Sequence, residues 1–151
     1  MMAASFQVPQ ATTKNPSDAQ SISYINKQYG FRFDLPASWK GYSILTNERS
    51  EGWSGSAPPP NLEKYMVISI RHPLWTKEDP RQDIPIMVFT RRQWALVEQE
   101  KLIVSAAPFP PSELGKNSEN VFALPARYNY GLLTGFEEVE KIMQGKPLHP
   151  F

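Results

Sequence analysis

Residues 29–35 alternate between apolar and polar side chains, which is the pattern of a β-strand with one buried face. Pro36 ends this predicted strand, because proline cannot donate a ladder hydrogen bond. Residues 42–46 are again mostly apolar and predict a second strand, which we expect to pair with the first across a short turn. The buried face of the first strand would carry Tyr29, Phe31, Phe33 and Leu35.

Two nearly continuous apolar segments, residues 65–71 and 84–89, contain several β-branched side chains. Such runs are typical of central strands that are covered on both faces of a sheet. Residues 102–106 and 120–124 predict two further strands. Residues 48–62 predict a loop, because they contain two glycines and three consecutive prolines whose fixed φ angles favour an extended chain.

A helix is predicted to begin after Thr90, because Gln93 follows three positions later and completes a capping box. The apolar stripe expected to face the core comprises Trp94, Val97 and Leu102. This is the strongest helix signal in the chain.

Thr134 and Glu137 form a second capping box, and Gly145 is placed to end the helix that it opens. The apolar stripe of this helix consists of Phe136, Val139, Ile142 and Met143. Residues 111–114 predict a single helical turn, and the two prolines in residues 146–151 predict a loose tail.

The predicted order of elements is four strands, a helix, two strands and a helix. This order favours an α+β fold, namely an αβα sandwich in which helices flank a central, largely antiparallel sheet. A flexible leader over residues 1–23 would precede a single domain over residues 24–145, and residues 146–151 would form the loose tail. A doubly wound sheet is disfavoured, since helices are lacking between most strands.

The composition narrows the possible functions. A chain of 151 residues corresponds to one domain that buries enough surface to fold without disulfides or a structural metal, which agrees with the absence of cysteine. A formal net charge of +1 disfavours a nucleic-acid binder. No apolar run approaches the roughly 18 residues of a membrane span.

The leader is rich in Gln, Thr, Ser, Asn and Pro, so it has little apolar surface to bury and is expected to be a tether. The small residues after Met1 and Met2 are of the kind found near signal-peptidase sites, but the charged and apolar regions of a signal peptide are missing. Either the remnant of a trimmed signal or an ordinary leader fits. A secreted, periplasmic or envelope-associated location is expected, with the cytoplasm as the alternative.

Residues 29–36 read Tyr-Gly-Phe-Arg-Phe-Asp-Leu-Pro and are followed by Trp39 and Lys40. This opening resembles that of PsbP-like and Mog1-like domains, and the segments 70–75 and 80–89 resemble small uncharacterised bacterial exported proteins. The resemblance implies the αβα sandwich described above. PsbP relatives are extrinsic subunits of the oxygen-evolving complex and Mog1 relatives bind a small GTPase, but no motif for either surface occurs here.

Ser54 is the candidate nucleophile of a hydrolase, because residues 52–55 resemble the start of a nucleophile elbow. The glycine expected two positions after the serine is replaced by Ser56, and the context is a loop. His72 and His149 are the two histidines that could serve as the base. A flexible loop is the simpler interpretation.

Two groups of charged residues could form a metal site or an anion site. His72, Glu78, Asp79 and Asp83 place an imidazole and three carboxylates in one loop, which could suit a hard cation such as calcium. Arg91 and Arg92 open a helix, where the dipole disfavours cations and an anionic partner would be attracted. Solvated charges explain both groups more simply, so no cofactor is predicted.

The most suggestive surface is aromatic and basic, and it follows two strand ends. Loops at the ends of strands are where binding residues tend to lie, and Trp, Tyr and Arg dominate interface hot spots. We therefore predict a non-catalytic module that binds another protein or a small ligand, with a hydrolase as the alternative. The other interpretation of these aromatic residues is that they cover the edge of the core. The candidate binding residues are Arg71, His72, Trp75, Arg127, Tyr128 and Tyr130.

Overall fold

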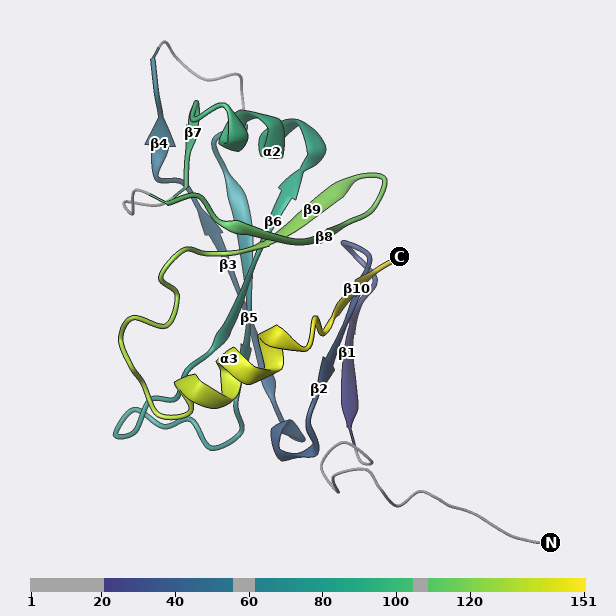
Figure 1. The fold of residues 1–151 in the computed structure, drawn as a ribbon, viewed down its shortest axis with the longest axis vertical. Coiled ribbons are helices and arrows are strands. Elements are labelled where there is room, and N and C mark those ends of the chain that lie inside the picture. The colour runs from purple at the N-terminus through teal and green to yellow at the C-terminus, as the bar shows by residue number, and fades with distance from the viewer. Residues whose placement is uncertain (1–20, 56–61, 105–108) are drawn as a thin grey trace, which may run out of the picture.

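The computed structural model describes residues 21–55, 62–104 and 109–151. Within them, ten strands form three antiparallel sheets, accompanied by two short helices and one 3-10 turn, η1 (Ala37–Trp39) (Figure 1). The central sheet has the strand order β3 (Ser43–Arg49), β5 (Tyr65–Arg71), β6 (Ile84–Thr90), β9 (Asn120–Leu124), β8 (Ser112–Lys116). The second sheet has the order β1 (Ile22–Asn26), β2 (Phe31–Leu35), β10 (Leu148–Pro150), and the third pairs β4 (Gly52–Trp53) with β7 (Leu102–Ile103).

The central sheet is buried on both faces, because successive side chains of a strand point in opposite directions. On β5, Ile68 and Ile70 belong to one apolar cluster, whereas Tyr65 and Val67 belong to the other. β6 divides its residues between the same two clusters. The nearly continuous apolar runs of these two strands follow from this arrangement, as predicted.

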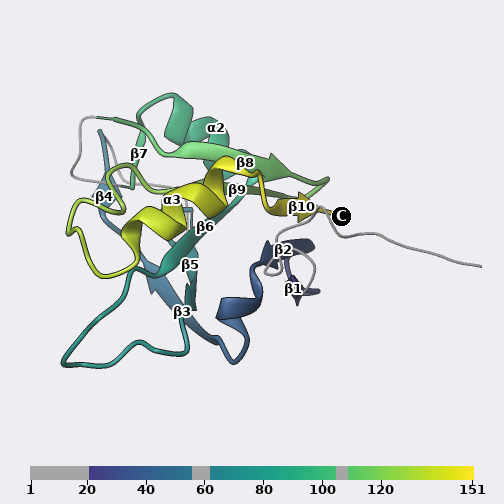
Figure 2. The ribbon, with the colours of Figure 1, turned by 60° about the horizontal axis from the view of Figure 1, so that its bottom comes forward.

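The three-stranded sheet and α3 (Phe136–Gln144) cover the first face of the central sheet (Figure 2). Phe31 and Phe33 of β2 are completely buried there, and the ring of Phe31 lies 4.9 Å from that of Phe122. Val139 of α3 and Leu148 of β10 belong to the same cluster. The predicted alternation of residues 29–35 therefore describes the face that β2 buries.

The second face is covered by α2 (Arg91–Glu98) and by the β4–β7 pair. Val97 and Leu102 pack with Phe89 in this cluster, and the rings of Tyr65 and Phe89 are 5.0 Å apart. The capping box of α2 is confirmed, since Thr90 and Gln93 exchange both hydrogen bonds. Leu102 lies on β7 and is not part of the helix stripe.

The αβα sandwich predicted from the sequence is wrong. The described residues form a mostly β structure whose two helices have 8 and 9 residues and lie over different faces of the central sheet (Figure 1). Much of the covering that helices were expected to supply comes from β-sheet, namely β1-β2-β10 on one side and β4–β7 on the other. The predicted pairing of residues 42–46 with the first strand is also wrong, because β3 pairs with β5.

Both predicted ends of the domain require correction. Residues 22–23 were assigned to the leader, but β1 begins at Ile22 and pairs with β2 along its whole length. Residues 1–20 lie outside the described residues. The tail is not loose: β10 pairs with β2, and Leu148 is only 6% exposed. The tail is held by its pairing with β2 and by the burial of Leu148. Neither contact can be read from the local composition.

Several shorter predictions also differ from the structure. Residues 112–114 of the predicted helical turn 111–114 belong to the edge strand β8. The strand predicted over residues 102–106 ends at Ile103, and its last two residues lie outside the described residues. The loop predicted over residues 48–62 contains β4, and residues 56–61 of it are likewise not described. Neither helix of the described part of the chain is long and apolar enough to cross a membrane.

The start of α3 uses a different cap from the predicted one. Gly135 occupies the N-cap with a φ angle of 83°, which glycine adopts without strain. The Thr134 hydroxyl instead donates a hydrogen bond of 2.7 Å to the carboxylate of Asp79. Gly145 ends the helix as predicted.

Candidate functional site

The two loops that carry the predicted binding residues lie against each other. We call them the first loop, residues 72–83, and the second loop, residues 125–135. The backbone N–H of Gln82 donates to the carbonyl of Thr134 at 2.8 Å, and Arg81 forms a parallel β-bridge with Thr134. The buried Gln82 side-chain amide donates to the carbonyls of Asp83 at 2.8 Å and of Tyr128 at 3.4 Å. The fold therefore joins two segments that are distant in sequence.

Arg71 contacts both Asp83 and Trp75 at the base of the first loop. The Arg71 guanidinium donates to both oxygens of Asp83, at 3.0 and 2.9 Å, and its carbon lies 3.8 Å from the centre of the Trp75 ring. The hydrogen bonds to Asp83 raise the pKa of Arg71. Because Asp83 is engaged by Arg71, it is not a free carboxylate for a cation.

His72, one of the predicted binding residues, is buried beside Trp39. It is 5% exposed, and its ring meets the edge of the Trp39 ring at 4.8 Å between centroids. Its Nδ1 accepts a hydrogen bond from the Leu74 backbone at 3.0 Å. Burial lowers the pKa of His72, the Arg81 charge lowers it further, and Glu138 acts in the opposite direction.

Tyr128 and Tyr130 have opposite roles in the second loop. Tyr128 is half-buried and packs against the core, and burial raises the pKa of its hydroxyl, with a smaller contribution from Glu140. Tyr130 is 68% exposed. The interpretation that these aromatic residues cover the core edge therefore holds for Tyr128 and not for Tyr130.

Arg127 connects Tyr130 with a residue that the sequence reasoning did not select. The Arg127 guanidinium lies 5.0 Å from the ring centre of Phe109 and 5.3 Å from that of Tyr130. Phe109 is 56% exposed, although it is a large apolar side chain. We call Phe109, Arg127 and Tyr130 the aromatic patch. The prolines on both sides of Phe109 in the sequence were the available signal, since they disfavour a buried strand there.

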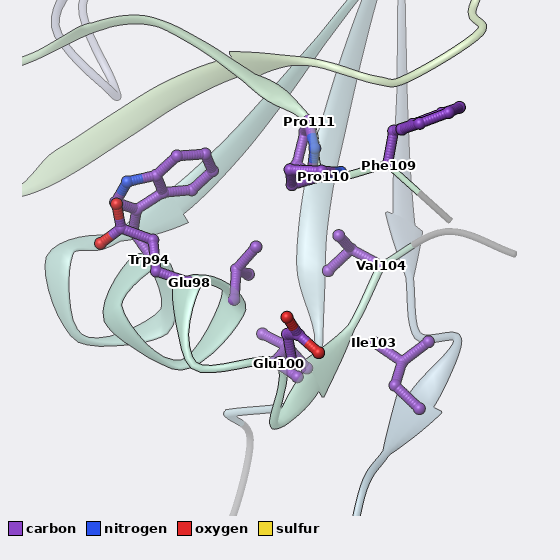
Figure 3. Close-up of a pocket in the computed structure, with 10 residues that line it drawn as sticks. Trp94, Glu98, Glu100, Ile103, Val104, Phe109, Pro110 and Pro111 are labelled. Carbon is purple, nitrogen blue, oxygen red and sulfur yellow. The ribbon is translucent and has the colours of Figure 1, made fainter. Parts of the chain in front are cut away.

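A pocket lies beside the aromatic patch, over the face of the molecule that carries α2 (Figure 3). Its volume is about 610 Å³, within the range of ligand-binding pockets. α2, the strand β7 and residues 109–111 supply its walls. The lining residues are Trp94, Val97, Glu98, Glu100, Leu102, Ile103, Val104, Phe109, Pro110 and Pro111.

The predicted hydrolase residues are not brought together. Ser54 is exposed next to β4, where its backbone N–H donates to the Lys101 carbonyl at 2.9 Å, whereas His72 is buried against Trp39. A hydroxyl, a carboxylate and an imidazole do meet at Asp34, which accepts from Ser23 at 2.8 Å and lies 3.1 Å from His149. The carboxylate lies between the other two groups, whereas a catalytic triad requires the imidazole in the middle.

The residues considered above as candidates for a metal or an anion site are not brought together in the described part of the chain. Among the described residues, no group of three His, Cys, Asp or Glu side chains is placed to hold a metal ion. Glu78 is exposed, and Asp79 accepts the hydrogen bond of Thr134. Arg91 donates to the Asn117 carbonyl at 3.2 Å, and Arg92 is exposed.

No protein-family model, no curated protein and no solved structure matches this chain. The resemblance of residues 29–40 to PsbP-like and Mog1-like domains therefore stays a prediction.

Proposed function

We propose that this chain is a non-catalytic binding module that recognises another protein through the aromatic patch. The observation that supports this most is the exposure of the two aromatic rings: Tyr130 is 68% exposed and Phe109 is 56% exposed. Exposed aromatic side chains beside an arginine are the kind of residues that carry most of the energy at protein interfaces. Leu132, in the same loop as Tyr130, is also mostly exposed. A cluster of this kind is unfavourable in water unless a partner covers it.

The loop beneath the patch is already ordered, which favours binding. The Tyr130 backbone N–H donates to the Arg127 carbonyl at 3.2 Å, and the Tyr128 carbonyl accepts from the buried Gln82 amide. Arg127 has a φ angle of 57°, which is uncommon for a residue other than glycine. A partner would not need to order this segment, so less binding energy would be lost to conformational entropy.

The location of the chain remains part of the proposal. We propose an exported or envelope-associated protein, which the polar leader and the resemblance to bacterial exported proteins support. A hydrolase centred on Ser54 or His72 is the less favoured alternative, because His72 is buried and its Nδ1 already accepts a hydrogen bond from the backbone of Leu74. Labelling with a serine-reactive probe that is lost in Ser54→Ala would favour that alternative.

Affinity capture with variants of the patch tests the binding proposal. The immobilised protein is compared with Arg127→Ala/Tyr130→Ala and with Phe151→Ala, and proteins retained from a lysate of the native host are quantified. Phe151 is the matched control, because it is an aromatic residue with 63% exposure outside the patch. We expect one or more proteins retained by the wild type and by Phe151→Ala to be lost with the double variant. Equal retention by all three forms would contradict the proposal.

A further inference from the structure

We infer that the pocket between α2 and the segment around Phe109 binds an apolar side chain of the partner together with a neighbouring lysine or arginine. This inference rests on the proposed function, because it names the chemistry of the segment that a protein partner would present. It is carried by two properties of the pocket, its apolar floor and its acidic rim.

Apolar side chains of α2, of β7 and of the residue after β7 form the floor of the pocket. Val97 of α2 and Leu102 of β7 line the pocket and are buried. Val104, labelled in Figure 3, follows β7 and lines the pocket as well. Ile103 lines the same pocket and is partly exposed. Because the three floor residues are already buried, the apolar surface that a peptide side chain would remove from water belongs to Ile103, 40% exposed, and Phe109, 56% exposed.

The rim carries negative charge where α2 ends. Glu98 is the last residue of the helix, Glu100 follows two positions later, and both line the pocket and are exposed. The last turn of α2 contains no basic residue, so the partial negative charge of the helix C-terminus is not offset there. Lys101 is the nearest cation in sequence, but it is not among the lining residues. The pocket therefore favours a ligand that carries a cation at this end.

Glu100 occupies a position at which glycine is usually preferred. The Lys101 N–H donates to the Leu96 carbonyl at 2.9 Å and the Glu100 N–H to the Val97 carbonyl at 3.0 Å, which is the Schellman pattern. Glu100 is the left-handed residue of this motif, with a φ angle of 62°. A side chain at this position costs conformational free energy. This motif places Glu100 on the rim of the pocket, where it lines the pocket and is exposed.

Phe109 makes the pocket continuous with the aromatic patch. Its side chain lines the pocket and also lies 5.0 Å from the Arg127 guanidinium. A segment that crosses the patch would thus reach the pocket without leaving the protein surface. This continuity is why we assign the pocket to an extended segment of a protein partner.

Selection from a random dodecapeptide library displayed on phage tests the inference. The wild-type chain is compared with Glu98→Gln/Glu100→Gln, whose folding is checked by thermal unfolding. We expect peptides selected on the wild type to contain an apolar residue within two positions of a lysine or arginine. Synthetic copies should bind the double variant about tenfold more weakly, since charge pairs at a partly desolvated rim contribute on the order of that factor. Selection without basic residues, equal affinity for the variant, or no selection would overturn the inference.

Two further variants keep the inference separate from the proposed function. Glu98→Lys/Glu100→Lys should select peptides with aspartate or glutamate in place of the basic residue. Arg127→Ala/Tyr130→Ala leaves the acidic rim intact, so peptides that fill only the pocket should still bind it, whereas the captured partner, which also contacts the patch, should be lost. If this variant loses the partner but no peptides are selected on the wild type, the pocket assignment is wrong and the proposed function still stands.

Discussion

The backbone N–H of Gln82 donates a hydrogen bond of 2.8 Å to the carbonyl of Thr134, and this contact joins the two loops beneath the candidate binding surface. The Gln82 side chain strengthens the connection through the carbonyls of Asp83 and Tyr128. Tyr128 packs on the core while Tyr130, two residues later, is exposed to solvent. The arrangement presents Tyr130 from a loop that is fixed on its inner side.

Gln82→Ala should destabilise the protein by about 0.5–1.5 kcal/mol, because the partly buried carbonyls of Asp83 and Tyr128 would lose the donor that the Gln82 amide supplies. The free energy of unfolding from urea titration measures the effect. Gln144→Ala is the matched control, since Gln144 is exposed at the end of α3 and its replacement should change the stability by no more than about 0.5 kcal/mol. Equal stability of the two variants would show that the Gln82 amide does not hold the loops.

Leu148→Ala should destabilise the protein by about 2–5 kcal/mol, the usual cost of removing a large buried side chain. Leu148 is 6% exposed and belongs to the core cluster that includes Phe33 and Val139. Phe151→Ala, only three residues later but at an exposed position, should have little effect. If Leu148→Ala leaves the free energy of unfolding unchanged, the tail is loose as the sequence predicted.

The stability should fall as the pH drops below about 6.5 because of His72. Burial lowers the pKa of His72 in the folded state below its ordinary value of 6.5, so the unfolded chain binds more protons in the interval beneath that value. Unfolding free energies at about pH 5.5 and 7.5 should therefore differ more for the wild type than for His72→Asn, which retains an acceptor near the position of Nδ1. An unchanged difference in His72→Asn would assign the dependence to other groups. His149→Asn is the control and should keep the contribution of His72.

Glu100→Gly should stabilise the protein while weakening peptide binding in the pocket. Relief of the left-handed conformation is worth roughly 1–2 kcal/mol, and the greater freedom of glycine in the unfolded chain takes back roughly 0.4–1 kcal/mol. A net gain of about 0–1.6 kcal/mol is expected, with a central value of about 0.8 kcal/mol. Glu98→Gly lies within α2 and should instead lose about 1 kcal/mol. A loss of stability in Glu100→Gly would contradict the assignment of Glu100 as the strained residue of the cap.

The local parts of the fold could be predicted from the sequence, and the long-range parts could not. The strand Tyr65–Arg71 and the capping box at Thr90 depend on neighbouring residues, and the structure confirms both. β10 exists because Leu148 pairs with Phe33, more than a hundred residues away, which no local pattern encodes. β8 has the polar sequence Ser-Glu-Leu-Gly-Lys and forms at the sheet edge by pairing with β9. The αβα sandwich was wrong because sheet, and not helix, supplies much of the covering.

The candidate site follows the same division. Arg127 and Tyr130 were predicted as binding residues because they follow the end of a strand. The structure places their side chains beside each other at the surface. The structure distinguishes these two residues from His72, which is buried, and from Tyr128, which packs against the core. Burial depends on the whole fold, so the sequence alone could not make this distinction. The pocket depends on the fold, which places α2, β7 and residues 109–111 around one cavity. Whether the six predicted residues bind a partner stays a prediction.

Site-specific photocrosslinking tests the central claim most directly. A photoreactive p-benzoylphenylalanine is placed at position 130 in one sample and at position 151 in another, and the chain is irradiated in its native host. Both positions carry exposed aromatic side chains, with 68% and 63% exposure, but only position 130 lies in the aromatic patch. A discrete covalent adduct with another protein at position 130 and none at position 151 is the predicted result. Absence of an adduct at position 130, or the same adducts at both positions, would contradict a binding surface at the aromatic patch.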